Sequence, residues 1–256
     1  MLSNDNDMTV RGGSSGAMTL LFRLLRIPRD IQSRAMFRAV REQCRGKVLD
    51  VGGWDFYLTA RAMKGIQFEH WTTLECSKDK LLSFDDPKFT CVLGDGCAMT
   101  MFKDASFDTV LNIQVLEHVV EPNAMMREVA RVLRPGGKAV FLIPQTGYMH
   151  MAPDHYYNFT RFWIRNQCET NGMDVIDLHP VGGLWASMGM HAIFFFLQSF
   201  RFPGFSTPEC KRPWTFYVLW PFMALAALCI IPVSLLLSFG DLTESANNHL
   251  VVARKR

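Results

Sequence analysis

The sequence predicts an α/β protein with a doubly wound, Rossmann-like sheet of seven mostly parallel strands and an apolar helical insertion before the last strand. Two observations predict this fold. Short apolar runs alternate with helix-length segments from residue 46 to residue 180, as in a parallel sheet covered by helices on both faces. A last short apolar run, His249–Ala253, follows only after residues 181–248, which is far longer than an ordinary connection.

The first six strands are predicted from runs that are rich in apolar and β-branched residues. The helix predicted for Pro122–Leu133 ends at the turn residues Arg134-Pro135-Gly136-Gly137, and the helix predicted for Phe159–Gly172 ends in a glycine. The six strand runs are KVLDVGG (47–53), WTTLE (71–75), TCVLGD (90–95), SFDTVLNIQ (106–114), KAVFLIP (138–144) and MDVIDL (173–178).

The N-terminal region divides into two parts. Residues 1–16 are rich in Asn, Asp, Gly and Ser, which predicts disorder, and they lack the basic start and apolar run of a secretory signal. Residues 17–45 predict basic amphipathic helices whose arginines face either solvent or anionic lipid headgroups. The arginines that share one face are Arg34, Arg38, Arg41 and Arg45.

Charge and cysteine content exclude several classes of function. A net charge of +3 is too small to predict nucleic-acid binding. The 7 cysteines are scattered without a CxxC pair, which predicts reduced thiols and no metal site. We therefore expect the α/β part of the chain to lie in the cytoplasm.

Three acidic residues end three successive predicted strands. They are Asp50, Glu75 and Asp95, each separated from the next by about one strand-and-helix unit. The carboxyl ends of parallel strands form the ligand edge of such a sheet, and Gly52 and Gly53 allow close approach of a ligand to the backbone there. Glu75 can accept both hydroxyls of a ribose, and Asp95 can accept an adenine amino group. The pattern predicts a nucleoside cofactor.

An ordered set of stretches resembles the class I S-adenosylmethionine-dependent methyltransferases, in the large type 11 subgroup typified by ubiquinone/menaquinone and sugar methyltransferases. The close resemblance covers roughly 100 residues. Its stretches are VLDVGG (48–53), LE (74–75), GDG (94–96), SFDTVLNIQVLEHV (106–119), EVARVLRPGGKAVFLIP (128–144) and DHYYNFT (154–160).

The resemblance implies S-adenosylmethionine as cofactor and assigns its site. Asp50, Gly52 and Gly53 would hold the methionine end, and Glu75 the ribose. Asp95 and Gly96 would hold the adenine, and Gln114 would line the pocket near the sulfonium. The segment Asp154–Thr160 would form a strap over the acceptor.

The glycine loop departs from the family pattern. Instead of G-x-G-x-G the chain has Gly52-Gly53-Trp54-Asp55-Phe56, and a tryptophan adopts a positive φ only at a cost. The loop is either re-routed and still binds the cofactor, or belongs to a catalytically weak or inactive scaffold protein. An NAD-dependent dehydrogenase is disfavoured because G-x-G-x-x-G is missing.

The candidate catalytic residues are His118, His155 and Tyr156. Methyl transfer to a hydroxyl needs removal of a proton, which a histidine can accept. His118, His150 and His155 are the candidate bases, although each could equally be a packing, capping or loop residue. Tyr156 and Tyr157 could contact an acceptor or simply pack.

The apolar insertion contains two long uncharged runs, Val181–Phe200 and Pro213–Gly240. Pro221 and Pro232 predict that the second run is broken into short pieces. Because the last strand must return to the sheet, we expect a monotopic anchor or a transmembrane hairpin on the cytoplasmic side of a membrane; a buried cap or dimer interface is the alternative. Residues 17–45 and 181–240 would contact the membrane, and the acceptor would be a lipid, a quinone or a lipid-linked sugar.

Overall fold

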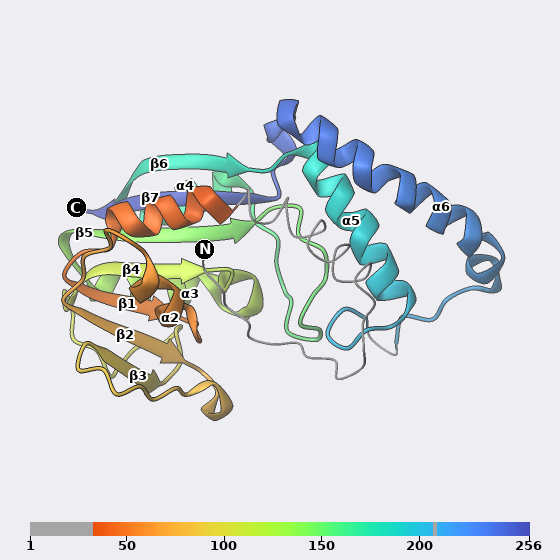
Figure 1. Cartoon of the computed structure of the whole chain (residues 1–256). Coiled ribbons are helices and arrows are strands. Elements are labelled where there is room, and N and C mark those ends of the chain that lie inside the picture. Colours follow the sequence, from red (N-terminus) through yellow and green to blue (C-terminus); the bar gives the residue numbers. More distant parts are fainter. Residues whose placement is uncertain (1–32, 207–208) are drawn as a thin grey trace.

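The computed structural model describes residues 33–206 and 209–256, so the predictions for residues 1–32 lie outside the described part. Seven strands form one sheet in the order β3-β2-β1-β4-β5-β7-β6 (Figure 1). The strands are β1 (Lys47–Val51), β2 (His70–Glu75), β3 (Phe89–Leu93), β4 (Phe107–Ile113), β5 (Leu133–Pro144), β6 (Met173–Val181) and β7 (Asn248–Lys255). The labelled helices are α2 (Phe56–Ala62), α3 (Pro122–Val132), α4 (Arg161–Thr170), α5 (Leu184–Ser199) and α6 (Trp214–Leu237), and residues 33–43 are also helical.

The direction of the strands confirms the predicted fold class. The pairs β1–β2, β1–β4, β2–β3 and β4–β5 are parallel, whereas β7 runs antiparallel to both β5 and β6. The chain moves from β1 outward to β3 and then returns to β4 on the other side of β1. Strand order therefore reverses between β1 and β4, and the carboxyl ends of these strands form the edge where open α/β sheets bind ligands.

Helices cover both faces of the sheet because each presents an apolar stripe to it. On one face, α3 and α4 bury Met126, Val129 and Ile164. On the other face, the helix at residues 33–43 buries Val40 beside Tyr57 of α2. The arginines of the first helix, Arg34, Arg38 and Arg41, are exposed as the spacing predicted.

The Arg134–Gly137 segment corrects one prediction. It continues as part of β5 instead of forming a separate turn before a strand at Lys138. Phe107 pairs with Leu133, and Thr109, two residues on, pairs with Lys138, so β5 carries extra residues as a bulge. Gly137 is required there because a Cβ would lie 2.9 Å from the Arg134 carbonyl oxygen. The proline and the two glycines do interrupt regular structure as predicted, but pairing with β4 makes the segment a bulge of β5.

The apolar insertion forms a helical hairpin of α5 and α6 beyond the carboxyl ends of the strands (Figure 1). The expectation that Pro221 and Pro232 break the second run is wrong, since both lie inside the continuous helix α6. Each proline removes only its own backbone N–H, and the neighbouring helical hydrogen bonds keep the helix intact. Gly189 of α5 meets Ser234 of α6 so closely that a Cβ on Gly189 would lie 2.3 Å from the Ser234 Oγ.

Polar groups fix the hairpin at both ends. The Asp241 carboxylate accepts hydrogen bonds from the Trp185 and Ala186 N–H groups, at 2.8 and 2.9 Å, and so satisfies the first turn of α5. The Arg212 guanidinium donates to the Ser199 carbonyl at 2.7 Å and also to the Gln198 carbonyl, at the last turn. These hydrogen bonds hold the hairpin in a defined position in the fold.

Candidate active site

Two candidate sites lie at the two ends of the parallel strands. A cleft of about 1160 Å³ lies at the amino ends, beside the starts of β1 and β4. Two of the acids that line it make structural contacts: Asp108 pairs with Arg134 at 2.5 Å, and Asp86 accepts a hydrogen bond from the Tyr57 hydroxyl at 2.7 Å. The candidate active site lies at the carboxyl edge instead, where the three strand-end acids gather.

Asp50 is the most unusual group at this edge. Its side chain is 1% exposed, and its Oδ2 has no hydrogen-bond partner among the described residues. Burial, with a smaller contribution from the Glu75 carboxylate, raises the pKa of Asp50 to about 8. A Cβ on Gly53 would lie 1.9 Å from Asp50 Oδ2, so only glycine fits there. A buried, unpaired carboxyl beside bare backbone suits a ligand that brings an amino group.

Trp54 takes the place of a glycine and adopts the backbone conformation of one. Its φ is +44°, which is the left-handed region, and Gly52 before it has a φ of +69°. The Trp54 N–H donates a hydrogen bond of 2.6 Å to Glu75 Oε1. This bond explains how the loop stays ordered without the family's second glycine. It also occupies one of the two Glu75 oxygens.

The remaining cofactor positions predicted from the sequence lie at the same edge. Asp95 is exposed, follows β3, and its Oδ1 accepts a hydrogen bond of 2.7 Å from the Cys97 N–H. Gly96 is buried, and a Cβ there would lie 2.6 Å from the Met125 Cε. Gln114 follows β4 with a φ of +57°, and its amide donates to Asn248 Oδ1 at 2.7 Å. The structure therefore brings these residues together, while their roles stay predictions.

The strap over the edge is attached to the loop after β4. Here we define the strap as residues 145–160. The Tyr156 N–H donates to the Glu117 carbonyl at 2.8 Å, and the Phe159 N–H donates to the Pro144 carbonyl at 2.8 Å. The Tyr156 hydroxyl, in a side chain that is 46% exposed, donates to Asp154 Oδ1 at 3.2 Å. Tyr156 is therefore partly exposed and in contact with Asp154.

The strap places two histidines against His118. The ring centroids of His118 and His150 are 4.8 Å apart, and those of His150 and His155 are 4.6 Å apart. Burial lowers the pKa of both His118 and His155, which favours their neutral form. The three candidate bases, which lie apart in the sequence, thus form one cluster.

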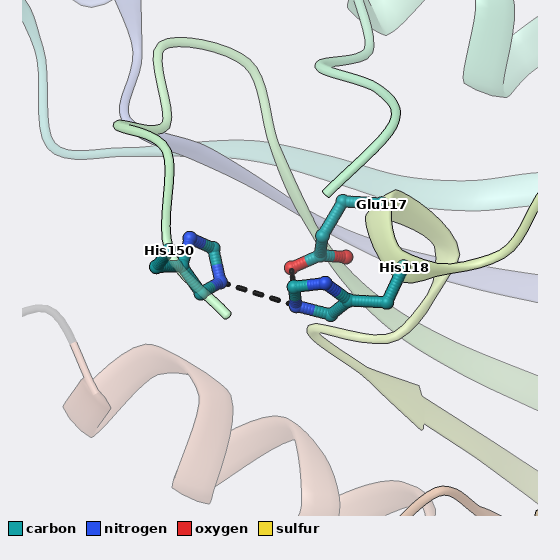
Figure 2. Close-up of side chains that lie close together, drawn as sticks. All are labelled: Glu117, His118 and His150. Carbon is teal, nitrogen blue, oxygen red and sulfur yellow. Dashed lines mark hydrogen bonds and ion pairs between the residues drawn. The ribbon is translucent and has the colours of Figure 1, made fainter. Parts of the chain in front are cut away.

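Glu117 completes this cluster, and sequence reasoning did not select it (Figure 2). Its side chain is fully buried, and burial raises the pKa of its carboxyl to about 8. His118 Nε2 lies 3.8 Å from Glu117 Oε1. The signal available in the sequence was an acid directly before His118 at a strand end.

Comparisons with known proteins identify a methyltransferase domain in this chain. The model of the methyltransferase domain family matches residues 56–141. Over 100 residues, the chain is 33% identical to Methyltransferase GfsG of Streptomyces halstedii, covering 36% of this chain and 35% of that protein. Over 82 residues, it is 34% identical to the Ubiquinone biosynthesis O-methyltransferase of Xanthomonas oryzae pv. oryzae, covering 24% of this chain and 34% of that protein. The chain spans about a third of the length of the curated relatives it matches.

Residues 56–141 therefore form a methyltransferase domain, on a chain with the fold of S-adenosylmethionine-dependent methyltransferases. Its fold matches a SAM dependent methyltransferase from Archaeoglobus fulgidus with a TM-score of 0.53 and 14% identity, over 93% of this chain and 99% of that one. It also matches Haemonchus contortus phosphoethanolamine N-methyltransferase 2, in complex with S-adenosyl-L-methionine, with a TM-score of 0.52 and 16% identity, over 86% and 52% of the two chains. The [4+2]-cyclase SpnF matches with a TM-score of 0.53 and 16% identity, over 90% and 80%. Because a cyclase shares the fold, the fold alone does not determine the reaction.

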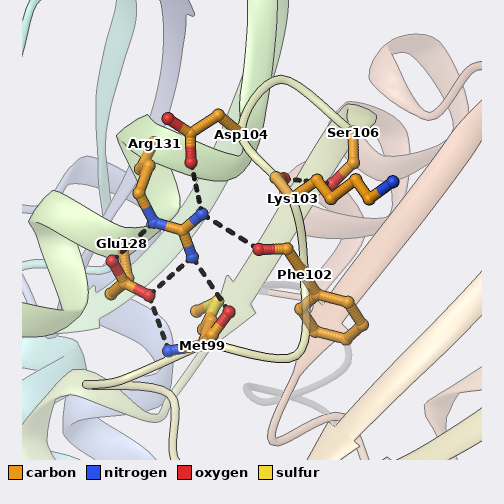
Figure 3. Close-up of polar contacts among 7 residues, drawn as sticks. All are labelled: Met99, Phe102, Lys103, Asp104, Ser106, Glu128 and Arg131. Carbon is orange, nitrogen blue, oxygen red and sulfur yellow. Dashed lines mark hydrogen bonds and ion pairs between the residues drawn. The ribbon is translucent and has the colours of Figure 1, made fainter.

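An ion-pair network supports the loop that follows Asp95 and Gly96 (Figure 3). The Arg131 guanidinium of α3 donates to the Met99 carbonyl at 2.9 Å and to the Phe102 carbonyl at 3.0 Å. Both Glu128 oxygens accept from Arg131 at 2.8 Å, and Arg131 holds the pKa of Glu128 below its usual value. The network ties the loop that follows Asp95 and Gly96 to α3. Arg131 therefore holds the loop in place through the Met99 and Phe102 carbonyls.

Proposed function

We propose that this chain is an S-adenosylmethionine-dependent methyltransferase that acts at a membrane surface on a lipid, a quinone or a lipid-linked sugar. One observation carries the proposal: the strap with His150 and His155 also contacts the apolar hairpin. The Tyr148 ring stacks on Phe194 of α5, and the Ala152 N–H donates to the Gly204 carbonyl at 3.1 Å. The segment that carries the candidate acid–base cluster is thus in contact with α5 and with the linker that leads to α6.

The residues at the carboxyl edge fit the cofactor. The unpaired Asp50 carboxyl and the bare backbone at Gly52 and Gly53 suit the amino acid end of the molecule. The free oxygen of Glu75 would bind the ribose, Asp95 and Gly96 the adenine, and Gln114 would line the pocket near the sulfonium. When bound, S-adenosylmethionine supplies a methyl group activated by its sulfonium.

The chain's own residues then have to orient the acceptor, exclude water and hold the leaving proton. His118 and His155 are the candidates for accepting a proton from an acceptor hydroxyl. Both are largely neutral because burial lowers their pKa values, so each keeps a lone pair for the proton. Tyr156, whose partly exposed hydroxyl donates to Asp154, would contact the acceptor.

The exposed face of α6 supports membrane contact. Of the described helices, Trp214–Gly240 is long and apolar enough to cross a membrane, with a mean hydropathy of 2.5. Seven of its large apolar side chains are exposed to between 58% and 78%. A continuous apolar surface of this kind is rare on soluble proteins and favours a lipid or protein partner. These side chains include Trp214, Tyr217, Phe222, Leu225, Leu228, Leu236 and Phe239.

We favour an interfacial anchor on the cytoplasmic side over a transmembrane hairpin. Helix α5 has 16 residues, fewer than the roughly 20 that a span requires. The linker between the helices carries Arg201, Lys211 and Arg212, which a hairpin would have to translocate. The helix at residues 33–43 would contact the membrane only at its N-terminal end, near Arg34. Arg45, just past the other end of this helix, lines the cleft at the amino ends of the strands.

Liposome flotation of the whole chain tests the membrane part. We expect wild type to float with anionic vesicles and Phe222→Asp/Leu225→Asp to remain at the bottom. The matched control is Phe162→Asp on α4, since Phe162 is 71% exposed and Phe222 is 70% exposed. Wild type that stays at the bottom and elutes as a dimer would show that the hairpin is a protein interface instead.

Incubation of membranes with methyl-labelled cofactor tests the acceptor class. We expect label in the lipid extract, and less of it with Phe222→Asp/Leu225→Asp than with Phe162→Asp. Label found only in protein would contradict a lipid acceptor while leaving methyl transfer intact.

A non-catalytic scaffold is the second candidate, and one observation favours it: the Trp54 N–H already occupies Glu75 Oε1. Calorimetry with S-adenosylmethionine separates the two functions. Heat of binding at micromolar cofactor supports the enzyme. A folded chain that gives no heat at high micromolar cofactor supports the scaffold.

A further inference from the structure

The cluster after β4 brings three potential metal ligands together (Figure 2). Glu117, His118 and His150 each offer one ligand atom, and these atoms all lie within 4.8 Å of one another. His118 Nε2 and His150 Nε2 are 3.1 Å apart. Two nitrogens bound to one metal at about 2.1 Å lie about 3.0–3.4 Å apart at octahedral or tetrahedral angles. The distance between the two Nε2 atoms is therefore the distance expected for two imidazoles that bind the same metal ion.

Backbone carbonyls determine which ring nitrogens carry protons. His118 Nδ1 lies 2.5 Å from the Asp154 carbonyl oxygen, and His150 Nδ1 lies 2.9 Å from the Tyr148 carbonyl oxygen. A carbonyl oxygen only accepts hydrogen bonds, so each Nδ1 must be the donor. In the neutral rings, both Nε2 atoms then present lone pairs to each other. Such a pair is repulsive unless a cation lies between the two nitrogens.

Glu117 distinguishes a metal ion from a shared proton. A proton between the two nitrogens would relieve their repulsion, but the resulting imidazolium would reach the Glu117 carboxyl only over a long contact, since His118 Nε2 lies 3.8 Å from Glu117 Oε1. Both Glu117 oxygens are buried and lack hydrogen-bond partners among the described residues. A metal would bind both imidazoles and the carboxylate at once, after a small rotation of Glu117 to shorten the 3.8 Å gap between its Oε1 and His118 Nε2. The backbone carbonyls behind each ring are typical outer partners of metal-bound histidines.

We propose that Glu117, His118 and His150 bind a divalent transition metal ion, with zinc as the best match to two imidazoles and one carboxylate. Three protein ligands leave at least one coordination position open. That position would lie under the strap, where it could take an oxygen of the acceptor, and His155 would remain as the free base of the cluster. The ligands come from residues 117–118 and from residue 150, which is why neither local spacing nor the cysteine pattern predicted a metal site.

Metal binding to the full chain tests the site without depending on methyl transfer. The chain is stripped with a chelator and titrated with Zn²⁺ by calorimetry, and its visible absorption is recorded with Co²⁺. We expect one equivalent of Zn²⁺ to bind and Co²⁺ to give ligand-field bands. Glu117→Gln and His150→Ala should each weaken Zn²⁺ binding at least tenfold and change the Co²⁺ bands. The matched controls are Glu121→Gln and His191→Ala, which alter exposed residues of the same types.

Two results would overturn the proposal. One is a folded wild-type chain, by circular dichroism, that binds no Zn²⁺. The other is unchanged Zn²⁺ affinity in Glu117→Gln and His150→Ala, which would assign the metal to cysteines. Because the readout is metal binding, loss of the proposed methyltransferase function would leave this result unaffected, and the reverse also holds.

Discussion

Helices α3 and α6 distribute large and small side chains in opposite ways. In α3 the buried residues are large, among them Met126 and Val129, and the polar side chains face outward. In α6 the buried residues are the small Ala224, Ala227 and Ser234, while large apolar side chains face outward. Small residues between helices and large ones outside are typical of helices in apolar surroundings. The difference shows that α3 covers the sheet with its large apolar side chains, and it supports our proposal that α6 contacts an apolar environment outside the chain.

The largest expected effect is a loss of stability on the α3 side alone. Met126→Ala should lower the free energy of unfolding by about 2–5 kcal/mol, because it leaves a cavity under the sheet. Leu225→Ala in α6 should change it by less than about 0.5 kcal/mol, because that side chain is 62% exposed. Urea unfolding of both variants measures the difference. Equal losses of unfolding free energy in the two variants would indicate that the outer face of α6 is covered.

A substitution between α5 and α6 should have the next largest effect. Gly189→Ala would place a Cβ 2.3 Å from the Ser234 Oγ and should cost about 1–3 kcal/mol through overpacking. Gly240→Ala is the matched control, since its Cβ would meet nothing within 4 Å. Thermal unfolding should show a lower midpoint for Gly189→Ala only. If Ser234→Gly does not restore the midpoint of Gly189→Ala, the close contact of these helices is not the cause.

The carboxyl edge of the sheet differs from both helical regions because it retains a buried, unpaired acid. The raised pKa of Asp50, about 8 against 3.8 in the unfolded chain, means that the folded chain holds this proton more tightly. The contribution of Asp50 to stability is therefore full below about pH 4 and declines as the pH rises toward 8. Asp50→Asn should remove this decline and stabilise the chain without cofactor, on the order of 1–3 kcal/mol at pH 8.

Two measurements check this prediction. Unfolding at pH 5 and pH 8 should give a smaller difference for Asp50→Asn than for wild type. Calorimetry should show that the same variant binds S-adenosylmethionine more weakly. A variant that gains no stability at pH 8 would show that Asp50 already has a partner in solution.

The smallest expected effect concerns the loop after β1. Trp54→Gly should relieve the positive φ, +44° in wild type, and improve cofactor affinity by about 0.5–1 kcal/mol, roughly two- to fivefold. The side chain is 53% exposed, so little packing is lost. Cofactor titration measures the change. Weaker binding would indicate that the indole contacts the cofactor, and absence of binding in both chains would favour the scaffold.

Local patterns predicted the elements of the sheet because apolar periodicity and strand-end residues reflect local burial. The last strand was predicted as His249–Ala253, and it extends over Asn248–Lys255. From local preferences, the prolines of α6 predicted a broken helix and the glycines after α3 predicted a turn. The structure has a continuous helix and a bulged strand at these places. A continuous helix tolerates the missing N–H groups of Pro221 and Pro232. A neighbouring strand at Phe107 and Thr109 draws residues 134–137 into β5.

The sequence by itself determined the fold class, the resemblance to methyltransferases and the strand-end acids Asp50, Glu75 and Asp95, because these depend on residues close together in the chain. Only the tertiary structure decided which distant groups share an environment. It placed His150 against His118 and beside the buried Glu117, and it brought the strap into contact with α5. Such contacts depend on how a loop folds back over the sheet edge. The chemistry of the groups that meet there depends on their burial and on the distances between them, and the spacing of residues along the chain predicts neither.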